Sequence, residues 1–116
     1  MTIRDTGDLA RTISTFTPAG ELRMPHVLVI HEVDDYRAWK AVFDNASQLL
    51  TDAGELEFHV LVDTTNPNRI VHYAKWASLE AARAFFQSPQ VEEIRRRAGV
   101  KAPQFIYLDM MDFGVR

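Results

Sequence analysis

The chain of 116 residues is 47% hydrophobic and 25% charged, values typical of one soluble globular domain. Its net charge of −3 predicts no general attraction to nucleic acid or to anionic lipid, and the absence of cysteine excludes disulfides, thiolate metal sites and cysteine nucleophiles. The amino-terminal segment has no uninterrupted apolar stretch, so we expect no signal peptide, no membrane span and a cytoplasmic protein.

The amino-terminal part differs in pattern from the rest of the chain. Residues 1–24 combine turn-forming residues with scattered apolar ones, and we expect a weakly structured extension there. The remaining residues, 25–116, carry regular patterns and are predicted to form one domain. That domain opens with a run of β-branched and apolar residues, His26–Val33, which predicts a buried strand.

A helical pattern follows this strand. Asp34 or Asp35 is suited to cap its amino end, because a short carboxylate accepts hydrogen bonds from the first free backbone N–H groups. Apolar residues then recur at helical spacing as far as Ala53, and Gly54 is suited to end the helix. The next segment, Glu55–Asp63, alternates in polarity and predicts a second strand.

The second half of the domain repeats this order with a hairpin at its start. The turn-forming residues 64–68 precede a third predicted strand, Arg69–Trp76. A helix is expected to start at Ser78, to break and restart at Ser88, and to end near residue 99. A fourth strand is predicted for Gln104–Asp112. With right-handed crossovers, this order predicts a four-stranded antiparallel sheet with both helices on one face, the ferredoxin-like α+β arrangement βαββαβ.

Alternation along the strands predicts which side chains share a face of this sheet. In the second strand Phe58 and the residues of the same parity are all apolar, and we expect them under the helices. If Val62 pairs with Arg69, His59 lies opposite His72, and both point to the other face. A register different by one residue would separate the two histidines.

The same assignment for the remaining strands completes the face that the helices leave open. It places His31 there with His59 and His72, together with Trp76. The apolar residues expected on this face are Val27, Val29, Val33, Leu61, Ile70, Ala74, Phe105, Tyr107 and Met111. Those expected under the helices are Leu28, Ile30, Val71, Tyr73, Ile106, Leu108 and Met110. Because so apolar a face needs a cover, we expect a second copy to close a dimeric α+β barrel, with pockets between sheet and helices or between the two sheets.

Residues 69–93, RIVHYAKWASLEAARAFFQSPQVEE, resemble the antibiotic biosynthesis monooxygenase superfamily of dimeric α+β barrels. The shared features are the pair Tyr73 and Trp76 at a strand end, an Ala-rich helix and the Ser88-Pro89 step. The stretch HEVDDYRAWKAVFD is also similar to a bacterial subgroup of small proteins, and the likeness spans residues 25–112. The resemblance implies a fold found in cofactor-free oxygenases, isomerases, haem-degrading enzymes and proteins without known activity.

Three positions depart from the patterns of the resembled superfamily. Many members carry an acidic residue where Ala74 stands and a histidine where Phe85 stands. Haem-degrading members have a tryptophan near Phe85 and a histidine where Arg95 stands. Haem degradation of that type is therefore not expected.

The three strand histidines are the candidate catalytic residues. An unperturbed imidazole titrates around pH 6.5, so His31, His59 or His72 is suited to act as a general base near neutral pH. His72 is the preferred base because it lies beside Trp76 in the family-like strand, and Asp109 is a candidate to orient a histidine. The alternative is that each histidine is a packed strand residue with one hydrogen bond.

Aromatic residues of the same face are the candidate ligand-binding groups. Trp76 and Phe105 are suited to stack on a planar ligand, and Tyr107 to donate to a developing oxyanion. The three histidines and Asp109 are conceivable metal ligands, but ligands on separate strands without a local motif are a weak signal, so no metal and no other cofactor is predicted. Residues 95–97 are interpreted as a solvated helix end without a nucleic-acid role, and Trp39, Phe43 and Phe85 as core.

These features together predict a small homodimeric enzyme for a planar hydrophobic substrate such as a polyketide, phenol or quinol. A histidine would remove an acidic proton, and the resulting anion would react with oxygen without a cofactor. Two alternatives remain: a non-redox cyclase or isomerase that uses the same deprotonation, and a non-catalytic ligand-binding or accessory barrel.

Overall fold

The computed structural model describes residues 25–116, so the predicted amino-terminal extension lies outside the described residues. Pro25–Leu108 form one compact unit, and residues 109–116 belong to another. The helices and strands are, in chain order, β1 (Pro25–Val33), α2 (Tyr36–Asn45), α3 (Ser47–Ala53), β2 (Glu55–Asp63), β3 (Asn66–Trp76), α4 (Leu79–Phe86), α5 (Pro89–Arg97) and β4 (Val100–Asp109). Within the part of the chain that is described, no helix combines the length and the apolar character that a membrane crossing needs.

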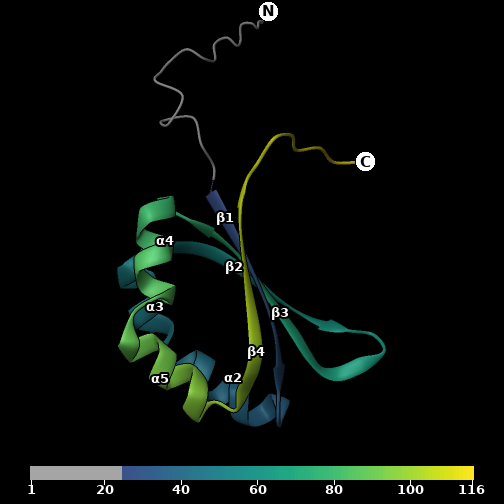
Figure 1. Ribbon diagram of the computed structural model, residues 1–116. Coiled ribbons are helices and arrows are strands. Elements are labelled where there is room, and N and C mark those ends of the chain that lie inside the picture. Colours follow the sequence, from purple (N-terminus) through teal and green to yellow (C-terminus); the bar gives the residue numbers. More distant parts are fainter. Residues whose placement is uncertain (1–24) are drawn as a thin grey trace, which may run out of the picture. The chain divides into compact units, whose positions relative to one another are not determined.

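The strands form one sheet in the order β2-β3-β1-β4, and helices α2–α5 lie on one of its faces (Figure 1). This order, with neighbouring strands antiparallel, is the predicted ferredoxin-like α+β fold. The helices therefore cover one sheet face, and the other face has no cover within Pro25–Leu108.

The helix boundaries follow from the capping residues. The Asp35 carboxylate accepts a hydrogen bond of 2.9 Å from the backbone N–H of Ala38 and starts α2. The single helix expected up to residue 53 is two helices, because the chain leaves helical geometry at Ala46, with φ −88° and ψ 5°. The break predicted at Ser88 is confirmed, since its hydroxyl accepts from Val91 N–H at 3.2 Å and α5 begins there.

The pairing of β2 with β3 differs by one residue from the predicted register. Val62 pairs with Ile70 rather than with Arg69, so His59 lies opposite Tyr73. The cause is the hairpin: β3 begins already at residue 66, and an irregularity of the pairing between residues 62 and 63 shifts the register. His72 lies opposite Val60 and therefore shares its face, not that of His59.

This shift reverses the predicted faces of β1, β3 and β4. On β1 and β3, residues predicted to point away from the helices are buried beneath them. They are Val27, Val29, His31 and Val33 of β1 and Ile70, His72, Ala74 and Trp76 of β3. On β4, Phe105 and Tyr107 pack against the core beneath the helices. The face of β2 was predicted correctly, since Phe58 contacts Phe43 of α2 at 5.2 Å between ring centroids. The wrong register predicted for the hairpin thus assigned the side chains of β1, β3 and β4 to the wrong sheet faces.

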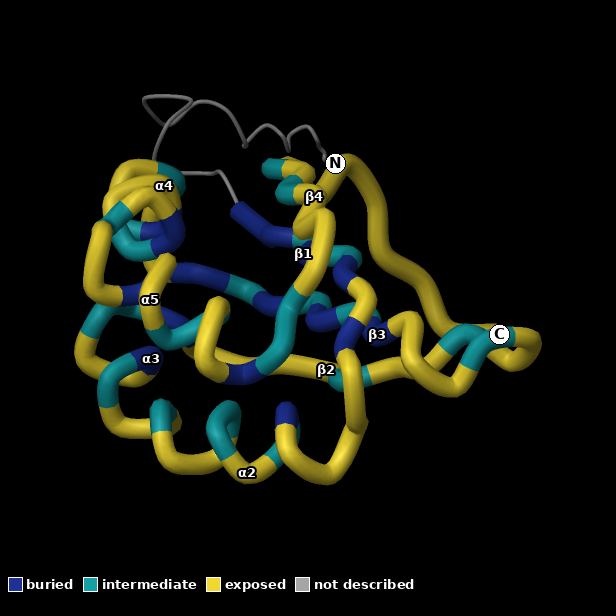
Figure 2. The backbone as a smooth tube through the Cα atoms, turned by 60° about the horizontal axis from the view of Figure 1, so that its bottom comes forward, coloured by how far each residue is buried: buried dark blue, intermediate teal, exposed yellow. Residues whose placement is uncertain are grey.

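The core lies between the sheet and the helix layer. Its larger cluster joins β1 and β3 to helices α3 and α4 through Val27, Val29, Leu50, Ala74, Trp76, Ala82 and Phe86. A second cluster joins Val33, Trp39, Ile70 and Ala98. The most buried stretches of backbone accordingly run along the central strands β1 and β3 (Figure 2).

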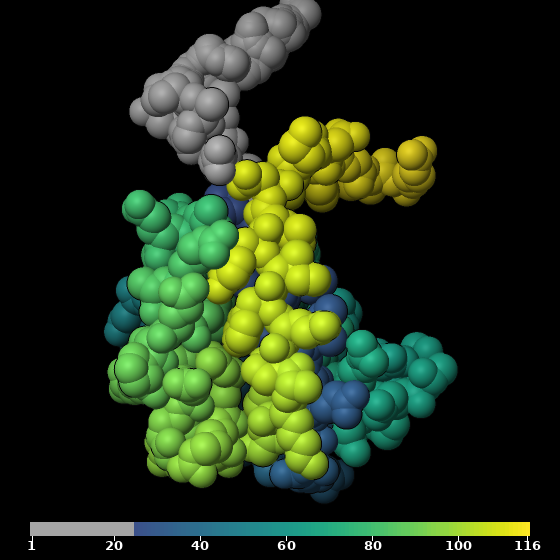
Figure 3. All heavy atoms as spheres, viewed as in Figure 1, coloured from purple at the N-terminus to yellow at the C-terminus, as the bar shows by residue number. Residues whose placement is uncertain are grey.

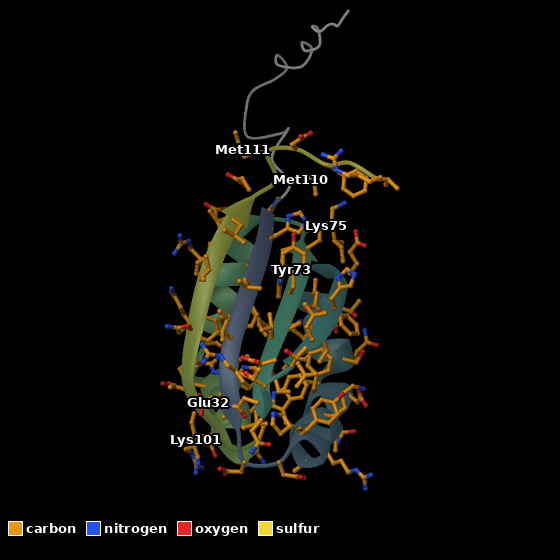
Figure 4. The ribbon with its side chains drawn as sticks, turned by 90° about the vertical axis from the view of Figure 1, so that its right-hand side faces the viewer. Glu32, Tyr73, Lys75, Lys101, Met110 and Met111 are labelled. Carbon is orange, nitrogen blue, oxygen red and sulfur yellow. The ribbon has the colours of Figure 1, made fainter. Side chains whose placement is uncertain are left out.

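The face without helices is apolar, as predicted, but apart from Leu61 it is built from other residues. We call it the open sheet face and define it by Leu28, Ile30, Leu61, Val71, Tyr73, Ile106 and Leu108. Figure 4 looks onto this face and shows the side chain of Tyr73 on it. Leu61 and Ile106 leave 52% and 41% of their surface in solvent.

The reversed faces can be tested by stability. Ile70→Ala should lower the free energy of unfolding by roughly 2–5 kcal/mol, because the side chain is fully buried between sheet and helices and its loss leaves a cavity. The matched variant is Leu56→Ala, whose side chain is 60% exposed and whose loss should cost no more than about 0.5 kcal/mol. Urea unfolding followed by circular dichroism measures both. Equal losses for the two variants would contradict the assigned faces.

Candidate functional site

A cavity of about 70 Å³ lies between the sheet and the helices. Its wall takes residues from β1, β3, the start of β4 and helices α2–α5, and it is mostly apolar. The polar side chains in this wall are His31, His72 and Arg95, together with the indole of Trp39. Two of the three predicted histidines therefore line one apolar space, although under the helices and not on the open sheet face.

The cavity has an outer neighbour. A hollow of about 310 Å³ lies between α2 and α3 on one side and α5 on the other. The two spaces share the wall residues Val42, Ala46, Leu49 and Ile94. A benzene ring is held by a cavity of roughly 150 Å³, so an aromatic ligand needs more room than the inner cavity alone offers. Movement of the shared apolar side chains would join the two spaces into one.

His31 is the polar group of the cavity that lacks a partner. Its side chain is buried, and neither ring nitrogen has a hydrogen-bond partner among the described residues. Burial, with further contributions from nearby His72 and Arg95, lowers the pKa of His31 from 6.5 to about 4. The ring is therefore neutral at physiological pH and offers one N–H donor and one acceptor nitrogen to a ligand.

His72 differs from His31 because it has a buried acidic partner. Its Nε2 lies 2.8 Å from Oε2 of Glu55, and both side chains are only 5% exposed. If the carboxylate is ionised it can only accept a hydrogen bond, and Nε2 would then carry the proton and Nδ1 would be the basic nitrogen. The imidazole of His72 also makes a T-shaped contact with the ring of Phe43, with 4.9 Å between the ring centroids.

The β1–β3 register brings the two histidines together. His31 lies opposite Ile70, and His72 lies opposite Val29, so the two imidazoles are diagonal neighbours on one face. Diagonal positions in an antiparallel pair are roughly 7–8 Å apart at the backbone. A ligand of one ring can therefore contact both side chains at once.

Arg95 adds a cation to the same wall. Its Nη1 donates to the backbone oxygen of Phe86 at 3.2 Å, and its guanidinium lies 4.9 Å from the centroid of the Phe105 ring. Burial lowers the pKa of Arg95, which nevertheless stays charged because a guanidinium titrates far above neutral pH. The prediction of a solvated helix end is correct for Arg96 and wrong for Arg95, because only Arg95 turns toward the sheet.

The remaining predicted site residues do not line the cavity. His59 is exposed on the open sheet face, 6.1 Å from Tyr73 between ring centroids. Asp109 is the last residue of β4 and belongs to the other unit, 109–116. Trp76 is buried against Phe85, and its indole N–H has no partner in the part of the chain that the structure describes.

Phe105 and Tyr107 lie beside the cavity rather than in it. They line a hollow along the seam where α4 and α5 run beside β4 (Figure 3). Phe86 and Arg95 belong both to this hollow and to the cavity wall. The guanidinium of Arg83 covers the Tyr107 ring at 4.3 Å. These two aromatics are thus neighbours of the site through Arg95.

The three histidines do not form a metal site, because His59 lies on the opposite sheet face from His31 and His72. Residues 25–116 contain no cluster of three or more side chains suited to hold a metal ion.

The sequence interpretation also missed Glu55. Simple alternation puts Glu55 on the face of Glu57, but an irregularity of the β2–β3 pairing between these two residues turns it inward.

Comparisons with known proteins agree with this architecture. The family model for antibiotic biosynthesis monooxygenases matches residues 34–97. Among solved structures, the chain is similar to SnoaB, a cofactor-independent oxygenase from Streptomyces nogalater, with a TM-score of 0.66 and 13% identity over 78% of this chain and 96% of SnoaB. It is also similar to the monooxygenase ActVA-Orf6 of Streptomyces coelicolor in complex with nanaomycin D, with a TM-score of 0.60 and 19% identity over 81% and 93% of the two chains.

Likeness at these identities shows a shared fold. No curated protein matches the chain significantly. The family model covers more than half of the chain, from the cap of α2 to the end of α5, which are the elements that build the helix side of the cavity. The chain belongs to the antibiotic biosynthesis monooxygenase family.

Proposed function

We propose that this protein is a cofactor-independent monooxygenase for a planar, hydrophobic, phenol- or enol-bearing molecule, with His72 as the base. The observation that carries the proposal is the cavity under the helices. There, a carboxylate-paired histidine and an unpartnered neutral histidine lie side by side in an apolar wall. Buried polar groups without partners are rare in folded proteins, so the free nitrogens of His31 support a ligand in this space.

The two histidines are suited to different roles. His72 has Nδ1 free, and the Glu55 carboxylate would stabilise the imidazolium formed when Nδ1 takes a proton. His31 has too low a pKa for an effective base near neutral pH, but its neutral N–H can donate to an oxygen on which negative charge develops. Arg95 supplies positive charge to the same wall. This division of roles keeps His72 as the preferred base and gives His31 a separate role as a hydrogen-bond donor.

The proposed reaction uses the substrate itself as the reductant and dioxygen as the oxidant. Loss of a proton from an activated CH₂ carbon to Nδ1 of His72 leaves a carbanion that is delocalised into the ring system. The carbanion adds to dioxygen, and return of the proton gives a hydroperoxide. The hydroperoxide loses water and leaves a carbonyl group, so one oxygen atom enters the product and the other leaves as water.

The chemistry of the wall favours a particular kind of substrate. Apolar side chains on both sides of the cavity suit a flat hydrocarbon framework, and the two histidines with Arg95 suit an oxygen that becomes negative. The complex of the related ActVA-Orf6 with nanaomycin D supports a ligand of that kind. Deprotonation without uptake of dioxygen would make the protein a cyclase or isomerase, and binding without turnover would make it an accessory barrel.

We also propose that a second copy covers the open sheet face. Its apolar side chains lie side by side on four strands, and so large an apolar patch is unusual on a monomer. The family fold supports this arrangement. In the proposed dimer the histidine cavity stays within each subunit, since His31 and His72 face the helices and not the partner.

Turnover tests the base. His72→Gln should reduce dioxygen uptake with hydroxylated anthrones by about 10²–10⁴-fold, because an amide can pair with Glu55 but cannot take a proton. Glutamine is preferred to alanine, which would leave the Glu55 carboxylate buried without a partner at a cost of about 3–5 kcal/mol. An oxygen electrode and product mass spectrometry measure the reaction.

The matched control is His59→Gln on the open sheet face, which should keep its turnover. Full activity in the His72 variant would refute the assigned base. Conversion of the anthrone without dioxygen uptake would show a cyclase or isomerase, and binding without conversion an accessory protein.

Acid should destabilise the protein through His31. Its pKa is about 4 in the folded chain against 6.5 when exposed, so the unfolded state binds more protons between these values. The stabilisation is fully present above about pH 6.5 and is lost as the pH falls toward 4, by on the order of 3 kcal/mol in total. Urea unfolding at several pH values should therefore give a shallower pH dependence for His31→Leu than for the natural chain or for His59→Leu. An unchanged slope in His31→Leu would show that the ring is not buried neutral.

The oligomeric state tests the cover of the open sheet face. The double variant Leu61→Lys with Ile106→Lys should be monomeric in sedimentation velocity where the natural chain is dimeric, because buried lysines across an apolar interface would lack partners. Val62→Lys is a suitable control, since Val62 is 53% exposed but points to the other side of β2. A natural chain that stays monomeric at high concentration would contradict the proposed dimer.

A further inference from the structure

We infer that Glu55 is the positioning residue of the site, which holds His72 in the one tautomer that can act as a base and connects it to solvent away from the substrate. The inference rests on the proposed function for its catalytic consequence. Its structural part, the tautomer of His72, can be measured without any substrate.

The position of Glu55 is set by the backbone and not by chance contact. Gly54 ends α3 with φ 124°, a conformation that favours glycine, and Glu55 follows directly as the first residue of β2 opposite Trp76. The irregular pairing between Glu55 and Glu57 turns the first carboxylate under the helices and leaves the second in solvent. An acidic group buried in this way needs a partner, and the 2.8 Å contact with Nε2 of His72 provides one.

The carboxylate makes the two nitrogens of His72 unequal. Because Oε2 can only accept, the proton stays on Nε2, and Nδ1 remains the basic nitrogen. When Nδ1 takes a proton, the ring becomes positive next to a negative carboxylate in a space from which water is largely excluded. Removal of the carboxylate should therefore lower kcat more than it changes KM. In the proposed site the substrate contacts His72 and not Glu55, whether Nδ1 of His72 is protonated or not.

Glu55 also lines a second hollow, which shares no wall residue with the hollow between α2, α3 and α5. This hollow of about 310 Å³ lies between α3 and β2. Its wall contains Glu55 together with Phe43, Asp44, Ser47, Leu50, Thr51, Leu56, Glu57 and Phe58. Phe43 and Leu50 belong to this wall and to the cavity wall, so the Glu55–His72 pair bridges the two spaces. We therefore expect small solutes to approach the position of Glu55 from this hollow and not from the substrate cavity.

The first experiment determines the tautomer of His72 by ¹⁵N NMR of the full chain, at a mildly alkaline pH. The natural chain should show a protonated Nε2 and an unprotonated Nδ1. Glu55→Gln should lose this preference, because its amide NH₂ can donate to Nε2. Glu57→Gln is the matched control. Glu57 is exposed, and an ion pair joins its Oε2 to Nζ of Lys75 at 3.8 Å, so this variant should leave the His72 signals unchanged. A protonated Nδ1 in the natural chain, or identical signals in Glu55→Gln, would overturn the inference.

The second experiment is chemical rescue. Glu55→Ala should lower kcat for dioxygen uptake by about 10–100-fold, the size of loss seen when the hydrogen-bond partner of a metal-bound histidine is removed. Added acetate or formate, which can enter through the hollow between α3 and β2, should restore at least part of kcat with little change in KM. His72→Gln should gain nothing from acetate. Equal kcat in Glu55→Ala and the natural chain would overturn the inference, and so would rescue of both variants to the same degree.

The two experiments separate this inference from the proposed function. If no anthrone or quinol is converted by the natural chain, the proposed function fails, while the NMR result still confirms or refutes the role of Glu55. If turnover depends on His72 but the tautomer is independent of Glu55, the proposed function stands and this inference falls. If Glu55→Ala does not fold, the NMR comparison of Glu55→Gln with Glu57→Gln decides alone.

Discussion

The pairing register of β2 with β3 is the constraint on which the rest of this structure depends. Side chains alternate between sheet faces with a period of two, so a shift of one residue moves a whole strand's side chains to the other face. The irregularity at the end of the hairpin selects Val60 as the partner of His72 and sends both beneath the helices. From there β1 follows through its own pairing with β3, and His31 comes to lie beside His72.

Burial beneath the helices gives the two histidines their distinct chemistry. His72 has a carboxylate partner and keeps one basic nitrogen, whereas His31 has no partner and a pKa of about 4. The same rings on the open sheet face would be like His59, which is exposed. The difference between a carboxylate-paired histidine and an unpartnered neutral one is therefore a consequence of topology, and the apolar wall around both makes their charge states matter.

Much of this architecture could be predicted from the sequence, and the failures share one physical cause. Helical spacing, caps such as Asp35 and strand composition identified the order of elements and hence the ferredoxin-like sheet. The face assignment failed because a pairing irregularity leaves no clear trace in composition, and it displaced His31, His72 and Trp76 together. Glu55 and Arg95 were missed for two different reasons. The first is turned by an irregular pairing, and the second stands in a run of three arginines whose charge hides the one that faces the sheet.

The central claim is that ligands bind between the sheet and the helices, against His31 and His72. The most direct test is a crystal structure of the full protein with a hydroxylated anthrone or naphthol. The account predicts the ring system inside the enlarged cavity, with a ligand oxygen within hydrogen-bond distance of His31 and the acidic carbon or hydroxyl facing Nδ1 of His72. A ligand bound on the open sheet face beside His59, with the cavity closed, would contradict it.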